Sequence, residues 1–400
     1  MGRFNELKIL NIFENSKPMF VERIIIHKRK MTLTIPFEAS FGKFDSLIRL
    51  FPEIVFKFEN GETVSGMGEC SPLTAPWYDS ECHRTTEIGL KFIIACLTGK
   101  NYEDADGYPL IKIEPVTDIF SFISRYKWIV GHNIAKTGIE GAYWDALAKF
   151  NSVPVSAIWG GIRKKVETGT SIGIQASPDD LIKKIDHAVN KLKVARVKIK
   201  VKPGKDISYV ERIRNSFPDL PLQVDANAAY NLFDTKHLST LKEMDNFDLT
   251  MIEQPGRNDD IIDHARQLAM LKTPICMDES ILSTDNTRHA IDLWRQYSTI
   301  EKLIINVKPP RVGGYLEAIK IAKLCNENGV SVWCGGMLES ALGKTANVHF
   351  SSRDEINLPG DHVSQAPYFL EDVGDSPHYE DGKITVPKGI GWGIRNLNVK

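Results

Sequence analysis

The chain has 400 residues, of which 42% are hydrophobic and 25% are charged, and its formal net charge is -1. This length suggests about two domains, one of which is long enough for a barrel of roughly 250 residues. A chain without a basic excess cannot neutralise many phosphates, which excludes nucleic acid as the main partner. No apolar run reaches the roughly 18 residues needed to cross a membrane, so a membrane role is excluded too.

The six cysteines are scattered and form no CxxC pair. We therefore expect free, buried thiols in place of disulfides or a zinc site. An apolar stretch at residues 9–13 is interrupted by Asn11 and is too short for a signal-peptide core. This favours a cytoplasmic protein. The oligomeric state stays open, with a homo-oligomer as one alternative.

The first predicted domain covers residues 19–150 and follows a polar extension at residues 1–18. Strand-like stretches come first and helical patterns come after them, which indicates an α+β domain. In chain order these elements are a strand from Val21 to Ile26, a strand at 48–58 interrupted at Phe51-Pro52, a strand around Val64, and helices at 80–99 and 134–149.

A second domain is predicted at residues 151–361, where short apolar runs alternate with amphipathic helices such as 207–217, capped by Asp206. Unbroken apolar strands that alternate with helices indicate a parallel α/β sheet, and seven or eight repeats favour a closed barrel. Residues 358–361 are expected to follow the last strand, and the tail 362–400 to return to the first domain. The strand-like runs are 169–173, 195–200, 220–225, 249–253, 274–278, 303–308 and 330–333.

Five polar residues end successive apolar runs, each about one βα unit from the next. They are Lys200, Asp225, Glu253, Asp278 and Lys308. In a parallel barrel such strand ends meet at the C-terminal mouth, where barrel active sites lie. We therefore expect the five side chains to converge.

The three acids among them predict a metal site. Asp225, Glu253 and Asp278 cannot all stay ionised at close range without a cation. Their hard oxygens suit Mg²⁺, with Mn²⁺ as the alternative, and the absence of neighbouring His or Cys argues against zinc. Solvated loop acids or helix caps would explain any one of them, but not three at matching strand ends.

The lysines predict the chemistry. Lys198, Lys200 and Lys202 alternate along one strand, and Lys202 is interpreted as the solvated end of it. Lys198 and Lys200 lie deeper, and their pKa values are expected to fall toward those of useful bases. Lys308 approaches from the far side. Two bases facing a metal-bound carboxylate are suited to moving a proton at its α-carbon.

These residues resemble the enolase superfamily and, within it, the muconate-cycloisomerase-like group. The closest likeness is to the o-succinylbenzoate synthase / N-succinylamino acid racemase family, and it covers nearly the whole chain from Phe20. The motifs that carry it are PFEASFG (36–42), GECSPLTAPWYDSE (68–81), WDALAK (144–149), TSIGI (170–174), KIKVKPG (198–204), DANAAY (225–230), IEQP (252–255), MDES (277–280), INVKPPRVGG (305–314), WCGGMLES (333–340) and LPGD (358–361).

The resemblance implies a modified (β/α)₇β TIM-type barrel, of class α/β, with an N-terminal α+β capping domain. It implies a small-molecule carboxylate substrate, Asp225, Glu253 and Asp278 as Mg²⁺ ligands, and Lys200 and Lys308 as the acid/base pair, supported by Lys198. Glu279 matches a position near the metal. The other matching positions, near the metal or along the substrate pocket, are Ser40, Phe41, Ser171, Asn227, Arg311, Gly335, Gly336 and Met337.

The same resemblance leaves the reaction open between o-succinylbenzoate synthesis, a dehydration in menaquinone biosynthesis, and N-succinylamino acid racemisation. One protein of this family can carry both. Muconate cycloisomerase is the alternative within the group, and a non-catalytic metal-binding protein is the alternative outside it. Lys43 in the capping loop and Pro310 in KPPR depart from the family pattern, which leaves substrate preference open.

Overall fold

The computed structural model describes residues 17–39, 42–99, 114–363 and 367–400. Its first part is a three-stranded antiparallel sheet in the order β1-β2-β3, formed by Met19–Ala39, Gly42–Phe58 and Thr63–Met67. The strand β2 runs through Pro52 without the predicted interruption. Proline lacks a backbone N–H, and in a strand this missing group would point to the same side as the residue's own carbonyl. The Pro52 carbonyl accepts from Gly68 N–H at 2.9 Å, on the side where β3 has ended, so no N–H of Pro52 is needed for the pairing of β2 with β3.

Helices cover this sheet, as the sequence predicted. The two long helices are α2 (His83–Thr98) and α4 (Asn133–Phe150), joined by the short helix α3 (Ile119–Ile123). The buried helix α4 lies so close to the sheet that a Cβ built on Gly68 would come 1.9 Å from the Gly138 carbonyl. Glycine is required at this crossing for space, and the tight contact fixes the loop that follows β3.

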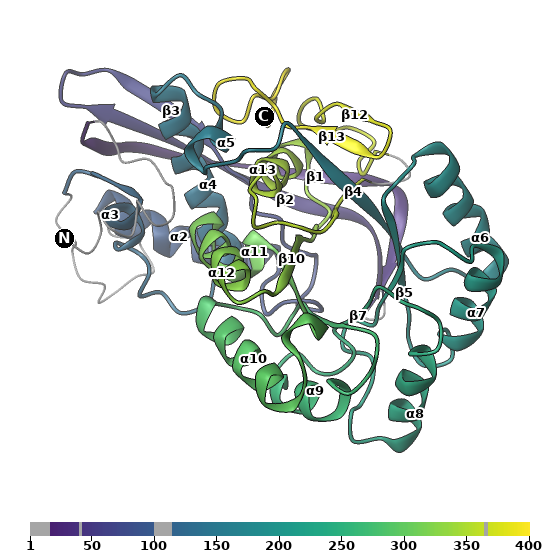
Figure 1. Cartoon of the computed structure of the whole chain (residues 1–400). Coiled ribbons are helices and arrows are strands. Elements are labelled where there is room, and N and C mark those ends of the chain that lie inside the picture. Colours follow the sequence, from purple (N-terminus) through teal and green to yellow (C-terminus); the bar gives the residue numbers. More distant parts are fainter. Residues whose placement is uncertain (1–16, 40–41, 100–113, 364–366) are drawn as a thin grey trace.

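The second part is a parallel sheet in the order β10-β9-β8-β7-β6-β5-β4, with β11 paired to β4. Figure 1 shows helices α6 to α10 following one another around its outer edge. The strands are β4 (Lys165–Ile172), β5 (Arg196–Lys200), β6 (Leu222–Asp225), β7 (Met251–Glu253), β8 (Ile275–Met277), β9 (Leu303–Val307), β10 (Ser331–Cys334) and β11 (Gly360–Val363).

The helices that alternate with these strands include α7 (Ile207–Ser216), whose predicted cap is confirmed because Asp206 accepts from Ile207 N–H. In the part of the chain that the structure describes, no helix is both long and apolar enough to span a membrane. The remaining α-helices of the described residues are α5 (Val155–Ile158), α6 (Pro178–Asp186), α8 (Thr235–Met244), α9 (Ile261–Leu268), α10 (Thr284–Tyr297), α11 (Pro309–Val312), α12 (Tyr315–Glu327) and α13 (Ala341–Ser351).

The eighth strand corrects the sequence prediction. Residues 358–361 were expected to follow the last strand, but they lead into β11, which pairs in parallel with β4. Only four residues long, it contains glycine, aspartate and histidine, so it lacks the apolar run by which the other strands were found. Its position brings Asp361 to the barrel mouth.

The C-terminal tail contacts both parts of the molecule. Its strand β13 (Lys383–Thr385) pairs with β12 (Tyr379–Glu380) and with the first residues of β4, next to the part of β4 that pairs with β11. Trp392 is buried, and its indole N–H donates to the Met67 carbonyl at 2.6 Å. Its backbone N–H donates to Asp145 of α4 at 3.0 Å. The tail therefore links the barrel to the N-terminal sheet.

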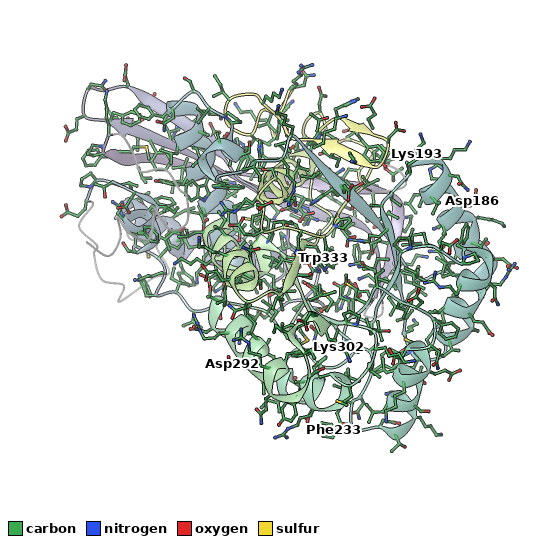
Figure 2. The ribbon with its side chains drawn as sticks, viewed as in Figure 1. Asp186, Lys193, Phe233, Asp292, Lys302 and Trp333 are labelled. Atoms are coloured by element: carbon green, nitrogen blue, oxygen red, sulfur yellow. The ribbon has the colours of Figure 1, made fainter. Side chains whose placement is uncertain are left out.

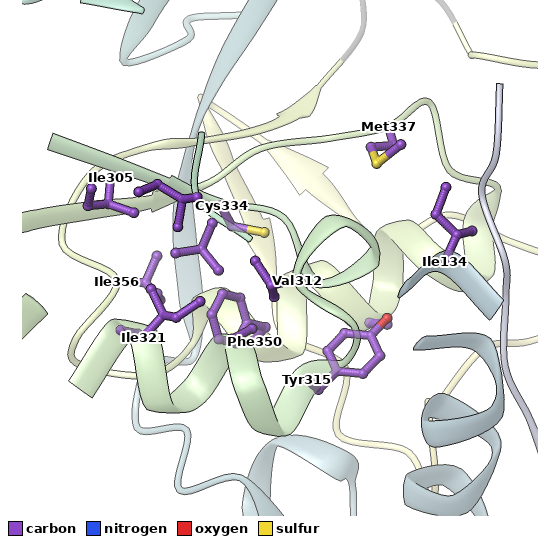
Figure 3. Close-up of a cluster of buried hydrophobic side chains, with 14 of the residues drawn as sticks. Ile134, Ile305, Val312, Tyr315, Ile321, Cys334, Met337, Phe350 and Ile356 are labelled. Carbon is purple, nitrogen blue, oxygen red and sulfur yellow. The ribbon is translucent and has the colours of Figure 1, made fainter. Parts of the chain in front are cut away.

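Buried apolar side chains form one large cluster beneath these elements and a second, smaller cluster that includes Trp333. Figure 3 shows Ile305 of β9, Cys334 of β10 and Ile321 of α12 in one buried apolar cluster. In Figure 2, Trp333 lies near the centre of the molecule and Phe233 lies at its outer edge. All six cysteines are buried and free, which confirms the expectation from their spacing.

Candidate active site

The five residues at the predicted strand ends gather at one mouth of the barrel. Lys200, Asp225 and Glu253 are direct neighbours in the sheet, because β5 pairs Lys200 with Asp225 and β6 pairs Asp225 with Glu253. Asp278 and Lys308 follow the ends of β8 and β9. The three carboxylates are fully buried. The parallel arrangement of the strands thus places all five groups at the same end of the barrel.

Lys198 lies at the centre of the acidic groups. Its Nζ is 2.9 Å from Glu253, 3.2 Å from Asp225 and 2.8 Å from Asp361. It also lies 4.6 Å from the centre of the Trp333 ring, a cation–π contact. The ammonium is therefore held by three carboxylates and an aromatic ring at once.

The prediction that the pKa of Lys198 falls is wrong. Burial alone lowers the pKa of the ammonium, but the charges of Asp361, Glu253 and Asp225 outweigh it, and the pKa is raised. Lys198 is therefore a fixed positive charge. The Lys308 pKa is raised as well, because Asp278 and Tyr78 outweigh its burial.

The carboxylates respond to the same balance of burial and charge. Burial and the neighbouring Asp225 raise the pKa of Glu253 to about 7, against the opposing effect of Lys198. Burial also pushes the pKa of Asp278 up, but Arg311 and Lys308 reverse this and hold it below its ordinary value. Neighbouring strand ends thus carry acids of very different proton affinity.

The two predicted bases are held in matching ways. Lys200 donates to Asp225 Oδ2 at 2.5 Å and to Asn227 Oδ1 at 2.7 Å. Lys308 donates to Asp278 Oδ2 at 2.9 Å and to the Tyr78 hydroxyl at 2.9 Å. Each lysine is therefore fixed by one strand-end carboxylate and one uncharged oxygen.

Sequence reasoning gave no role to Tyr78 and Asp361, although both stand inside quoted motifs. Tyr78 comes from the loop before α2, and its hydroxyl donates to Asp278 and accepts from Lys308 and Arg311. Asp361 contacts Arg196 at 2.7 Å as well as Lys198. Membership of the motifs PWYDSE and LPGD was the only sequence signal, and it did not reveal these contacts.

A cavity of about 440 Å³ opens above the lysines, between the barrel and the N-terminal sheet. Lys198, Lys200 and Lys308 all line it. Its wall also contains the predicted substrate-contacting residues Ser171, Asn227, Gly336 and Met337, together with Lys43 from β2. The Ser171 hydroxyl is shielded from solvent and has no hydrogen-bond partner among the described residues.

Two other predicted pocket residues are placed differently. Gly335 stands behind the wall, where a Cβ would lie 2.5 Å from the Lys308 side chain, so glycine leaves room for that lysine. Arg311 is buried beneath the cavity, in contact with Asp278 and with the Ile281 carbonyl at 2.9 Å. The remaining two, Ser40 and Phe41, lie outside the described residues.

The carboxylate oxygens of the strand-end acids are the ligands that a hard cation prefers, although lysine and arginine side chains contact these oxygens in this arrangement. Lysine and arginine groups contact all three strand-end acids, and among the described residues no three His, Cys, Asp or Glu side chains already form a ligand cluster. Glu279 supplies one buried oxygen, Oε2, without a partner among the described residues. Its Oε1 accepts from Asn227 at 2.9 Å. Buried, uncompensated carboxylate oxygens are what Mg²⁺ binds.

The N-terminal sheet is fastened over the cavity by a buried arginine. Arg49 of β2 donates to the Pro72 carbonyl at 2.6 Å and to the carbonyls of Met337 and Leu338 in the barrel at 2.9 and 2.7 Å. Glu69 accepts from Ser340 N–H at 3.0 Å and from Gly343 N–H at 2.8 Å. These contacts keep one wall of the cavity in place.

A capping sheet over an α/β barrel, with acids and lysines at the strand ends, defines a class of barrel enzymes. Residues 180–397 match the family model described as "Enolase C-terminal domain-like". The chain belongs to the enolase superfamily, as its sequence motifs predicted.

Its relatives include enzymes of two kinds. The chain is 39% identical to an o-succinylbenzoate synthase from Geobacillus kaustophilus, over 95% of both chains. It is 33% identical to an N-succinylamino acid racemase from Amycolatopsis sp, over 94% of this chain and 95% of the relative.

Solved structures agree with the fold. A member of the enolase superfamily from Listeria innocua has a TM-score of 0.82 and 32% identity, over 94% of this chain and 95% of its own. A dipeptide epimerase from Enterococcus faecalis, crystallised with Mg and L-Leu-L-Tyr, has a TM-score of 0.77 and 21% identity, over 94% and 99%. At that identity the second likeness supports the fold alone.

Proposed function

We propose that this enzyme removes a proton from the carbon next to a substrate carboxylate and stabilises the resulting enediolate. One observation carries the proposal. Lys200 ends β5 and Lys308 follows β9, four strands apart in the barrel, and both line the same cavity. Two lysines on opposite sides of one cavity are suited to addressing the two faces of a single carbon.

The acids would hold the metal that this chemistry needs. Asp225, Glu253 and Asp278 are the proposed ligands of Mg²⁺, with Mn²⁺ as the alternative. When bound, such a cation supplies positive charge for the oxygens of a substrate carboxylate. Lys198, fixed among three acids, would add a second positive charge near the same oxygens.

Two reactions follow from the same first step. In racemisation of an N-succinylamino acid, one lysine takes the α-proton from one face and the other lysine delivers a proton to the opposite face. In o-succinylbenzoate synthesis, Lys200 takes the α-proton and hydroxide leaves from the β-carbon, accepting the proton from Lys200 to form water. We propose that the chain carries out one or both, because its relatives bear both names.

The pocket wall would bind the acyl part of the substrate. Ser171, Gly336 and Met337 line the cavity on the barrel side, and the Ser171 hydroxyl, which has no partner among the described residues, can bind a carbonyl. A small-molecule carboxylate substrate, a cytoplasmic location and, for the dehydration, a place in menaquinone biosynthesis belong to the same proposal.

The test is exchange of the substrate α-proton in D₂O. The full chain is incubated with N-succinyl-L- and N-succinyl-D-amino acids, with Mg²⁺ or with EDTA, and the α-proton signal is followed by NMR. We expect Mg²⁺-dependent exchange of both enantiomers. A parallel assay follows formation of o-succinylbenzoate from its hydroxy-acid precursor. Absence of exchange and of dehydration at saturating Mg²⁺ would overturn the proposal, and the ratio of the two kcat/KM values decides between the reactions.

A further inference from the structure

Lys308 depends on the capping part of the chain for one of its two hydrogen bonds. Its Nζ donates to Asp278 within the barrel and to Tyr78, which stands 230 positions earlier in the chain. The ammonium also lies 4.4 Å from the centre of the Tyr78 ring. Both the hydroxyl and the ring therefore limit where this amine can lie.

The loop that carries Tyr78 is itself fixed at both ends. On one side, Glu69 accepts hydrogen bonds from Ser340 and Gly343 of the barrel. On the other, Glu81 accepts from Ile134 N–H of α4 at 2.9 Å. The neighbouring Trp77 stacks on Phe44 of β2, with ring centres 6.2 Å apart. A side chain anchored this way can position another group without moving much itself.

Lys200 provides an internal comparison. Its uncharged partner is Asn227, which belongs to the barrel and follows the neighbouring strand β6. An amine with two N–H directions taken up by fixed oxygens has one direction left for the substrate. The bases are thus equivalent in geometry, but only one of them is completed by the capping part of the chain.

We propose that Tyr78 is a positioning residue for Lys308: its hydroxyl and ring hold Nζ toward the substrate α-carbon, so that the loop carrying Tyr78 controls one face of the reaction. The inference rests on the proposed function and adds an assignment to it. Tyr78 acts through Lys308 and takes no proton from the substrate. Its loss should therefore affect one enantiomer far more than the other, whereas a merely structural role would affect both alike.

The test compares α-proton exchange of the two enantiomers in D₂O. Lys308→Ala first identifies the enantiomer that depends on Lys308. Tyr78→Phe should then slow exchange of that enantiomer about tenfold or more, as expected for a lost hydrogen bond to a charged group. Exchange of the other enantiomer should change by less than about twofold. Asn227→Gly, in which glycine tolerates the positive φ of 43° at this position, should show the opposite preference.

Tyr230→Phe is the matched control. It also removes a buried tyrosine hydroxyl, which donates to Asp206 at 2.9 Å, but does not touch either lysine. It should leave both exchange rates unchanged. Equal slowing of both enantiomers by Tyr78→Phe, or no slowing of either, would overturn the inference.

A second measurement separates this inference from the proposed function. Lysines of the metal-free protein are acetylated with limiting acetic anhydride and quantified by mass spectrometry. Tyr78→Phe should raise labelling of Lys308 several-fold relative to Lys200 of the same molecule, because one of the two oxygens that hold it is gone. If the native chain exchanges no α-proton, the proposed function fails, and the labelling ratio still decides the role of Tyr78. An unchanged ratio would refute it.

Discussion

Lys198 of β5 and Asp361 of β11 are joined by an ion pair of 2.8 Å that reaches across the intervening strand β4. The same ammonium contacts Glu253 at 2.9 Å. A lysine held by acids from different strands cannot leave its position to collect a proton. This contact sets Lys198, as a fixed charge, apart from Lys200 and Lys308, which we propose as the two bases.

Replacing Lys198 by methionine is therefore expected to slow exchange of both enantiomers together, by about a hundredfold or more, because a fixed charge near the developing negative charge is lost. It should also lower the free energy of unfolding by about 3–5 kcal/mol, since buried acids lose their partner. Denaturant unfolding and D₂O exchange test the two effects. Selective loss for one enantiomer would show that Lys198 acts as a base on one face.

The metal ligands give a second prediction. Asp225→Asn, Glu253→Gln and Asp278→Asn should each reduce activity by about a hundredfold or more while the fold survives, because one ligand fewer weakens Mg²⁺ binding and enediolate stabilisation. Activity and far-UV circular dichroism are measured across a range of Mg²⁺ concentrations. Near-native turnover in any variant, with metal still required, would mean that this acid is not a ligand.

The two bases should differ in their consequences. Lys200→Ala is expected to abolish dehydration and racemisation, because it removes the base that both reactions use. Lys308→Ala should abolish racemisation but leave α-proton exchange of one enantiomer, in which Lys200 removes and returns a proton on its own face. Exchange is measured on separate L and D substrates. Equal exchange of both enantiomers by Lys308→Ala would refute the two-base arrangement.

Lys43 lines the cavity from the capping sheet, far in sequence from the reacting groups. Lys43→Thr should change the ratios of kcat/KM among substrates with different acyl groups by several-fold, with a smaller effect on proton exchange itself. Lys57→Thr on the same strand is the control, because Lys57 pairs with Glu22 and does not line the cavity. Constant ratios across the panel would show that Lys43 does not contact the acyl group.

The buried side chain of His349 is expected to lower the free energy of unfolding in acid. Burial lowers its pKa from 6.5 to about 4, and its ring accepts from Ser156 N–H at 3.2 Å and lies 3.0 Å from the Trp392 carbonyl. Between these pKa values the unfolded chain binds the extra proton and the folded chain does not. The stabilisation is therefore complete above pH 6.5, is lost progressively as the pH falls from 6.5 toward 4, and is gone below about 4.

At pH 4.5 this loss should amount to about 2–3 kcal/mol. The difference in unfolding free energy between pH 7.5 and 4.5 should shrink by that amount in His349→Asn, whatever the stability of the variant at pH 7.5. Urea unfolding at the two pH values measures it. The same pH-dependent loss in variant and native chain would assign the acid sensitivity to other groups.

The sequence by itself determined the positions of the strand-end residues. Asp225 and Glu253 each end an apolar run, and the two runs are one βα unit apart. Parallel strands place such ends side by side at one edge of the sheet. Seven of the barrel strands, and the helix predicted at 207–217, followed from the same periodicity. Strand β11 did not, because its four residues lack an apolar run.

Only the tertiary structure decided how the site is completed. Tyr78 and Lys308 stand 230 positions apart, and no local pattern predicts that the loop before α2 reaches this lysine of the barrel. The pKa of Lys198 depended in the same way on which acids surround it, and Asp361 was one that the strand pattern had missed. Strand ends follow from backbone periodicity, whereas charge balance and side-chain contacts depend on how distant segments pack together.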